Sequence, residues 1–168
     1  MPTRSRDLTT DDVASIVALT AAEKDRMTIY RAVERIAAET VGFVFLTTLK
    51  YNEAEACVER LHSSNEQAYP VGGRKPLSKI ASSHRAMDDG AVFLAGTRQA
   101  VKEAFFDHEL IFALGSTAIL NAPIRFGGRR LGTLNFCGEE GKYGAGEVRN
   151  AQILAGLLIP CLMADNPG

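Results

Sequence analysis

The stretch from Thr117 to Cys137 reads TAILNAPIRFGGRRLGTLNFC, and it decides the fold. Two runs rich in apolar and β-branched residues, 117–126 and 129–137, flank the dipeptide Gly127-Gly128. Two consecutive glycines tolerate the positive φ angles that a two-residue turn requires, so the stretch predicts a β-hairpin. Because both of its faces are largely apolar, we expect the hairpin at the centre of a sheet that is covered on both sides.

The turn also predicts the register of the hairpin. Counting outward from the turn pairs Ile124 with Leu131 and Leu120 with Asn135. Since side chains alternate between the two faces of a strand, this register places Asn121 on the face opposite Asn135. A ligand pocket on one face would then receive at most one of the two asparagines.

The segments around the hairpin show helix and strand patterns in an order that indicates an α+β fold. Helices are predicted for 11–19, 20–40, 80–89, 97–105, 107–114 and 147–162, and strands for 43–51, 56–64 and 91–94. Thr10, Thr20, Thr97 and Asp107 are the predicted helix caps. Residues 63–79 form a predicted loop, and residues 1–9 and 165–168 are predicted tails around one domain, 10–164.

Composition narrows the functional class. The 168 residues include 19 Lys and Arg against 20 Asp and Glu, a net charge of -1, which argues against nucleic-acid or membrane binding through bulk charge. We find no secretory signal and no apolar run near the roughly 18 residues of a membrane span. The three cysteines are widely spaced and lack a Cys-x-x-Cys motif, so we expect reduced thiols and a cytoplasmic protein.

Three segments together resemble the GAF domain family. They are residues 42–45 with 60–65, the hairpin with its Asn121-Ala122-Pro123 and Gly132-Thr133-Leu134-Asn135 motifs, and the Tyr143-Gly144-Ala145-Gly146-Glu147 stretch. The resemblance implies a GAF/PAS-like central antiparallel sheet, with the terminal helices on one face and a ligand pocket under loops and helices on the other. In this family the terminal helices often form a homodimer, which would suit an apolar closing helix.

The sequence also departs from known subgroups of that family. It lacks the cysteine pattern of free methionine-(R)-sulfoxide reductases, the Asn-Lys-Phe-Asp-Glu motif of phosphodiesterase GAF domains, and the bilin-attaching cysteine of phytochromes. The chain ends soon after the closing helix, so a regulatory role would call for a separate output protein as partner. No cofactor is indicated.

Residues 60–75 are the most suggestive stretch for ligand binding. They bring together cationic, hydroxyl and aromatic side chains, namely Arg60, His62, Ser64, Tyr69 and Lys75. Alternation along the strand predicts Arg60 and His62 on one face. An arginine fork and a lysine point charge can bind a carboxylate or phosphate, although an exposed strand face followed by an ordinary loop explains the same residues.

Four further candidates each have a structural alternative. His108 could be an acid, a base or a ligand donor beside the helix cap Asp107. Asn121 and Asn135 could bind a ligand or be internally satisfied amides. Cys137 could be a nucleophile or a small buried residue. His84 is expected to be exposed, and the three histidines form no metal-ligand spacing.

These observations favour a domain that binds a small anionic or heterocyclic metabolite as a sensor or regulatory module. The alternative is a small enzyme that acts on such a metabolite and uses His62, His108 or Cys137 near Arg60 and Lys75. A third possibility is an interaction module that recruits another protein through its helices. The sequence identifies no catalytic residue.

Overall fold

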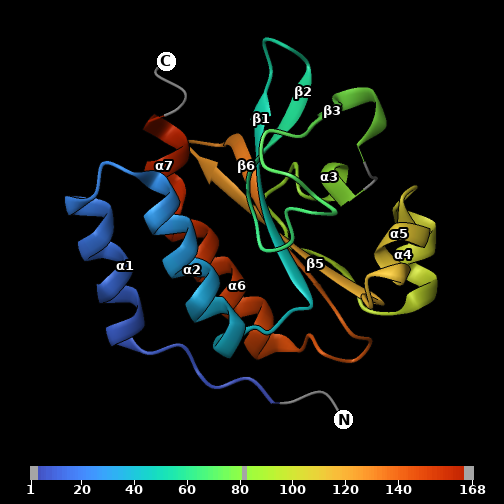
Figure 1. Cartoon of the computed structure of the whole chain (residues 1–168), viewed down its shortest axis with the longest axis horizontal. Helices are drawn as coiled ribbons and strands as arrows, with labels where there is room; N and C mark the ends of the chain where they lie inside the picture. The colour runs from blue at the N-terminus through green and yellow to red at the C-terminus, as the bar shows by residue number, and fades with distance from the viewer. Residues whose placement is uncertain (1–3, 81–82, 165–168) are drawn as a thin grey trace.

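The computed structural model describes residues 4–80 and 83–164, and its centre is a six-stranded antiparallel sheet (Figure 1). The strand order is β3-β2-β1-β6-β5-β4. The strands are β1 (Phe45–Asn52), β2 (Cys57–Ser63), β3 (Arg74–Pro76), β4 (Phe93–Ala95), β5 (Ala118–Phe126) and β6 (Arg129–Gly138). The hairpin β5–β6 therefore lies inside the sheet, as its sequence predicts.

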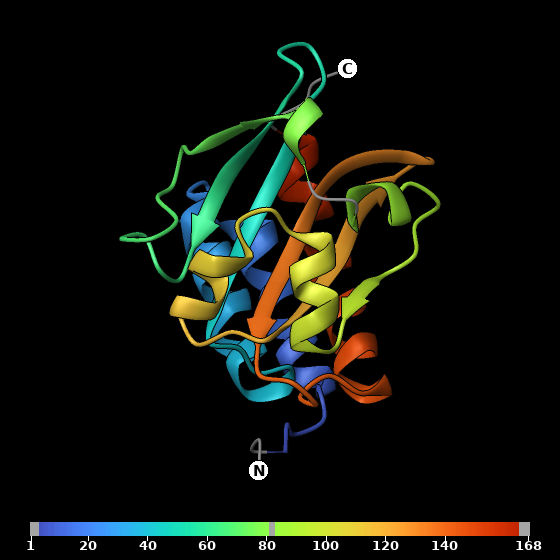
Figure 2. The ribbon, with the colours of Figure 1, turned by 90° about the vertical axis from the view of Figure 1, so that its right-hand side faces the viewer.

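Helices cover both faces of the sheet (Figures 1 and 2). One face carries α1 (Thr10–Ala22), α2 (Arg26–Thr40), α6 (Ala145–Leu157) and α7 (Ile159–Ala164). The other carries the 3-10 turn η1 (Leu77–Lys79) and the short helices α3 (Ser83–Ala86), α4 (Arg98–Ala104) and α5 (His108–Ala113). This arrangement confirms the α+β, GAF-like architecture. No helix of the described segments is long and apolar enough to cross a membrane.

The sheet separates two apolar clusters of unequal size. The larger lies under the terminal helices, where α2 buries one apolar stripe made of Ile29, Val33, Ile36, Ala37 and Thr40. The smaller lies on the other face and includes Phe45, Ile111 and Ile119. Burying each large apolar side chain contributes about 1.5–3 kcal/mol, so the helical face supplies most of the hydrophobic stabilisation.

The predicted turn of the hairpin is confirmed, but its predicted register is wrong. Gly127 and Gly128 have φ angles of 59° and 75°. A β-bulge next to Ile124 shifts the pairing by one residue, so Asn121 lies opposite Asn135. A one-residue shift moves a side chain to the other face of the sheet. Both asparagines therefore lie on the same face.

A second bulge corrects the prediction that Arg60 and His62 share a face. Thr48 of β1 pairs with His62 of β2, whereas the next residue, Leu49, pairs with Arg60. Leu61 is thus the extra residue of the bulge, and alternation is interrupted there. The Arg60 side chain lies on the face covered by the short helices, whereas the His62 side chain lies on the other face and contacts α2.

The start of the chain also differs from its prediction. The cap of α1 is Thr9 rather than Thr10, because Thr9 and Asp12 exchange hydrogen bonds in a capping box. Arg6, placed in the predicted tail, donates to Asp12 at 2.7 Å and to Glu39 at 2.7 Å. The Arg6 guanidinium holds the pKa of the Asp12 carboxyl well below its usual range.

Other predicted segments also differ from the structure. Thr20 does not begin a helix: α1 continues to Ala22, and Asp25 caps α2. The predicted loop 63–79 contains β3 and η1, and the predicted helix 80–89 is reduced to α3, with 81–82 outside the described residues. The closing helix divides at Leu158, since Pro160 cannot continue the hydrogen bonding of α6. The predicted tail 165–168 also lies outside the described residues.

Candidate functional site

A cavity of about 80 Å³ lies between the sheet and the short helices α3 to α5, and we call it the cation cavity. Cationic, amide and aromatic side chains line it together with aliphatic ones. The lining residues are Phe45, Thr47, Leu49, Arg60, Tyr69, Lys75, His84, Phe105, Ile111, Ile119, Asn121, Asn135 and Cys137. Of the predicted site residues, the fold thus brings together Arg60, Tyr69, Lys75, Asn121, Asn135 and Cys137.

Arg60 enters this cavity from β2. Its Nη1 donates to the carbonyl of Pro70 at 3.0 Å, and its guanidinium lies 5.0 Å from the centre of the Tyr69 ring. Tyr69 in turn stacks on Phe45. The Nε of Arg60 is buried without a hydrogen-bond partner in the described part of the chain. Burial lowers the pKa of Arg60, which means that the site disfavours an uncompensated positive charge there.

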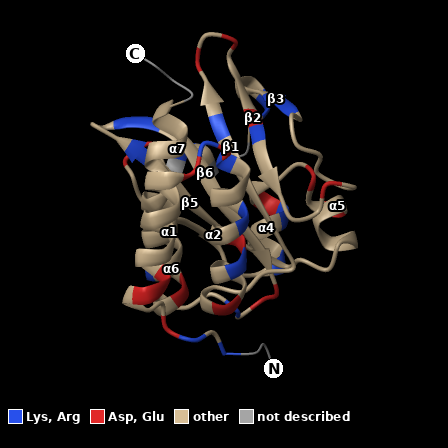
Figure 3. Cartoon of the chain, turned by 60° about the vertical axis from the view of Figure 1, so that its left-hand side comes forward, with Lys and Arg blue, Asp and Glu red and all other residues tan. Residues whose placement is uncertain are grey.

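Lys75 enters from the edge strand β3. Its Nζ lies 4.7 Å from the centre of the Phe106 ring, and burial lowers its pKa. Within residues 4–80 and 83–164, neither Lys75 nor Arg60 has a carboxylate within ion-pair distance. Figure 3 shows the blue basic segments of β1, β2 and β3 side by side on the sheet.

The sequence predicts Asp107 as the cap of α5, but its side chain makes no capping hydrogen bond. Its Oδ2 instead accepts a hydrogen bond from the hydroxyl of Tyr69 at 3.0 Å. The carboxylate therefore positions the ring on which Arg60 lies. An acidic residue before a helix can either cap the helix or accept a hydrogen bond from a distant side chain. The sequence does not distinguish these two roles of Asp107.

The two asparagines form a hydrogen-bonded ladder across three strands. Asn121 Nδ2 on β5 donates to Asn135 Oδ1 on β6 at 2.5 Å, and Asn135 Nδ2 donates to Thr47 Oγ1 on β1 at 3.2 Å. Asn121 Oδ1 is buried and has no partner among the described residues. The ladder depends on the bulge beside Ile124, since the register expected from the turn would separate Asn121 from Asn135.

His84 is a lining residue that sequence reasoning misses, because its polar surroundings indicate exposure. It is only 8% exposed, and its Nδ1 lies 2.5 Å from the hydroxyl of Tyr51. Burial raises the pKa of Tyr51 to about 12 and lowers that of His84 to about 4. Tyr51 therefore donates to a neutral imidazole, and His84 brings no charge to the cavity at neutral pH.

Three predicted residues lie elsewhere. His62 faces α2, where its Nε2 lies 2.5 Å from Glu34 Oε2. Ser64 accepts a hydrogen bond from the backbone N–H of Leu46. His108 donates through Nδ1 to the carbonyl of Phe105 and lines a separate outer cavity of about 690 Å³ between η1 and α4.

Cys137 does lie in the cation cavity, but it is nearly fully buried. Burial raises the pKa of its thiol, so the thiolate form is disfavoured. In the described part of the chain, no cluster of three or more His, Cys, Asp or Glu side chains could hold a metal ion. The lining of the cation cavity presents two cations, two amides and aromatic rings.

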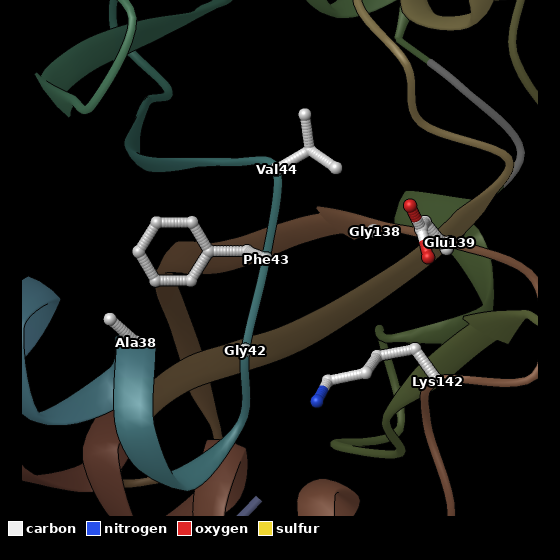
Figure 4. Close-up of a pocket in the computed structure, with 7 residues that line it drawn as sticks. All are labelled: Ala38, Gly42, Phe43, Val44, Gly138, Glu139 and Lys142. Carbon is white, nitrogen blue, oxygen red and sulfur yellow. The ribbon is translucent and has the colours of Figure 1, made fainter. Parts of the chain in front are cut away.

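A further cavity of about 260 Å³ opens at the end of α2 (Figure 4). Figure 4 shows the Lys142 side chain extending toward Gly42, with Glu139 beside Gly138. Lys142 Nζ donates to Ser5 Oγ at 3.1 Å, so its charge is already hydrogen-bonded. Among the described residues, Arg60 Nε and Asn121 Oδ1 are buried polar atoms without a partner at the cation cavity, and no residue that lines the cavity at the end of α2 has such an atom.

The comparisons with known proteins bear on the fold. No family model matches the sequence, and no curated protein matches it. The structure is similar to the GAF domain of a phosphoenolpyruvate-protein phosphotransferase from Coxiella burnetii, with a TM-score of 0.74 and 14% identity over 94% of this chain and 93% of that one.

Two other solved structures are similar. The GAF domain of a two-component sensor histidine kinase from Bacillus halodurans has a TM-score of 0.67 and 13% identity over 86% of this chain and 100% of that one. Free methionine-R-sulfoxide reductase from Neisseria meningitidis, solved with its substrate, has a TM-score of 0.69 and 13% identity over 99% of each chain. The strand order, the two helical layers and these similarities agree: the chain has a GAF-like fold.

Proposed function

We propose that this chain is a regulatory domain that binds a small anionic metabolite in the cation cavity. The observation that carries the proposal is the pair Arg60 and Lys75, two partly buried cations that line one cavity without a carboxylate partner among the described residues. The solved structures with this fold include a GAF domain of a sensor histidine kinase, which supports a regulatory role.

The energetics of the two cations favour an added anion. Taking a charge out of water costs several kcal/mol, and contact with an aromatic ring returns only about 0.5–2 kcal/mol. Tyr69 and Phe106 therefore offset part of the cost at Arg60 and Lys75. A carboxylate or phosphate that accepts from the unpartnered Arg60 Nε would offset more, because charge-assisted hydrogen bonds are about twice as strong as neutral ones.

The charge around the cavity points the same way. Arg60 and Lys75 contribute two positive charges and Asp107 one negative charge, while His84 is neutral. The balance is one net positive charge in a partly desolvated site, where electrostatic attraction is stronger than in water. A monovalent anion would neutralise it.

Binding is better supported than catalysis. Of the residues considered for an enzyme, only Cys137 lies in the cation cavity, and burial keeps its thiol protonated. His62 and His108 contact other parts of the molecule, so neither is placed to activate that thiol.

Thermal unfolding with a panel of short carboxylates and inorganic phosphate tests the proposal. A ligand present at 100 times its Kd stabilises the folded state by about 2.7 kcal/mol, equivalent to a rise in Tm of roughly 5–11 °C for a domain of this size. The substitution Lys75→Met keeps the aliphatic stem and removes the charge, so the affinity measured by calorimetry should fall about tenfold or more.

Lys50→Met is the matched control. Lys50 follows the cavity residue Leu49 on β1, so it points to the opposite face, where it lies 3.8 Å from Glu59. Its substitution should leave the affinity unchanged. If no anion in the panel raises Tm, or if both lysine variants weaken binding equally, the proposed site is wrong.

A further inference from the structure

We infer that the ligand of the cation cavity is a short anion that also carries an O–H or N–H donor, which Asn121 Oδ1 accepts. This inference rests on the proposed function and specifies the ligand class. The evidence is the asparagine ladder, which lies on the cavity side of the sheet. Its hydrogen bonds leave Asn121 Oδ1 without a donor among the described residues.

The ladder uses its groups in one direction. Asn121 on β5 donates to Asn135 on β6, and Asn135 donates to Thr47 on β1. Both hydrogen bonds therefore run in the same direction across the sheet, from β5 to β1. The carbonyl of Asn135 is occupied, whereas that of Asn121 has no donor in the described segments. Asn121 is 4% exposed, so bulk water does not meet this need.

A buried acceptor without a partner weakens the binding of a ligand that leaves it unmet by roughly tenfold or more, which is enough to select among ligands. The apolar neighbours Phe45, Ile111 and Ile119 have no side-chain donor to offer. A water molecule inside the cavity would donate to this acceptor, and a ligand that displaces such a water must replace its hydrogen bond. A purely apolar tail would lose affinity at this position, whereas a hydroxyl or amino group would not.

The size of the cavity limits the length of the ligand. Its volume of about 80 Å³ is small beside the roughly 300–1,000 Å³ of pockets that enclose drug-sized ligands. An anion that reaches Arg60 and Lys75 therefore has space for a very short substituent toward Asn121. Short 2-hydroxy acids and acid amides combine an anion and a donor at this scale.

Two pairs of acids test the inference by calorimetry on the full chain. Glycolate and propionate differ by a hydroxyl in place of a methyl group, and oxamate and pyruvate differ by an amino group in place of a methyl group. We expect glycolate and oxamate to bind at least about tenfold more tightly than their methyl counterparts, because only they donate to Asn121. In Asn121→Leu this preference should fall to within about twofold.

Asn150→Leu is the control for losing a buried amide. Asn150 lies on α6 and donates to the carbonyl of Thr40 on the helical face, far from the cavity lining. This variant should lose stability but keep the preference for glycolate. The comparison within the unmodified chain decides the donor requirement even if Asn121→Leu does not fold.

The outcomes separate the inference from the proposed function. Equal binding of both members of each pair overturns the donor requirement and leaves an anion site intact. A preference that persists in Asn121→Leu overturns the assignment to Asn121. If none of the four acids binds, the inference fails, and a panel that also shows no binding of other anions removes the proposed function with it.

Discussion

Gly132 is the position where a single methyl group should disturb the fold most. It lies on β6, paired with Lys50 of β1 and Ile124 of β5, beside the bulge and under Leu162 of α7. A Cβ at this position would overlap the backbone carbonyl of Leu49 and come within 2.5 Å of Leu162 Cδ2. The carbonyl belongs to the β1 ladder and cannot rotate away as a side chain would.

The cost of Gly132→Ala follows from these two contacts. Overpacking a core costs typically 1–3 kcal/mol, and a strained ladder hydrogen bond adds about 1 kcal/mol. We expect a loss of about 3 kcal/mol in the free energy of unfolding, which lowers Tm by roughly 6–12 °C. Because the chain has no tryptophan, urea unfolding is best followed by far-UV circular dichroism.

Gly156→Ala is the same chemical change with the opposite expected sign. Gly156 lies in α6, and a Cβ added there would meet no other atom of the described residues within 4 Å. Alanine should therefore stabilise the helix by about 0.5–1 kcal/mol. If Gly132→Ala changes the free energy of unfolding by less than about 0.5 kcal/mol, the β1–β6 interface yields more easily than this reasoning allows.

Two further predictions concern the cavity. The pKa of His84 is about 4 in the fold and 6.5 in the unfolded chain, so the unfolded chain takes up a proton as pH falls through this window. The free energy of unfolding should therefore drop by at most about 3 kcal/mol between pH 6.5 and 4. Urea titrations of His84→Gln should show a smaller drop. The same pH dependence in the variant and the unmodified chain would contradict this. Asp107→Asn can still accept from Tyr69 but removes the negative charge beside the cations. Calorimetry should then show glycolate binding several-fold tighter, and weaker binding would refute the charge argument.

Much of the fold could be predicted from local patterns. Gly127-Gly128 defines the hairpin, the stripe of α2 defines its buried side, and Thr97 caps α4 by accepting from Ala100 as expected. What local patterns could not give were the two bulges. The extra residue of each bulge is a leucine, and both Leu61 and Leu131 look like ordinary strand residues.

The same bulges limit the prediction of the site. Arg60, Tyr69 and Lys75 can be found from their chemistry alone, because cations and an aromatic ring near glycines suggest a binding loop. Strict alternation groups His62 with Arg60, and the bulge at Leu61 breaks that alternation. The burial of His84 escapes prediction because its partner Tyr51 is 33 positions away, and pairings at such separations depend on tertiary structure.

The bulge in β2 places two nearby side chains on opposite faces of the sheet. Arg60 touches the cavity, and two residues later His62 contacts Glu34 on α2, with its ring stacked on Tyr30. β2 therefore contacts the cavity and α2 through two side chains that are only two positions apart. A ligand bound at Arg60 would lie one short segment of backbone away from the packing of α2 on the sheet.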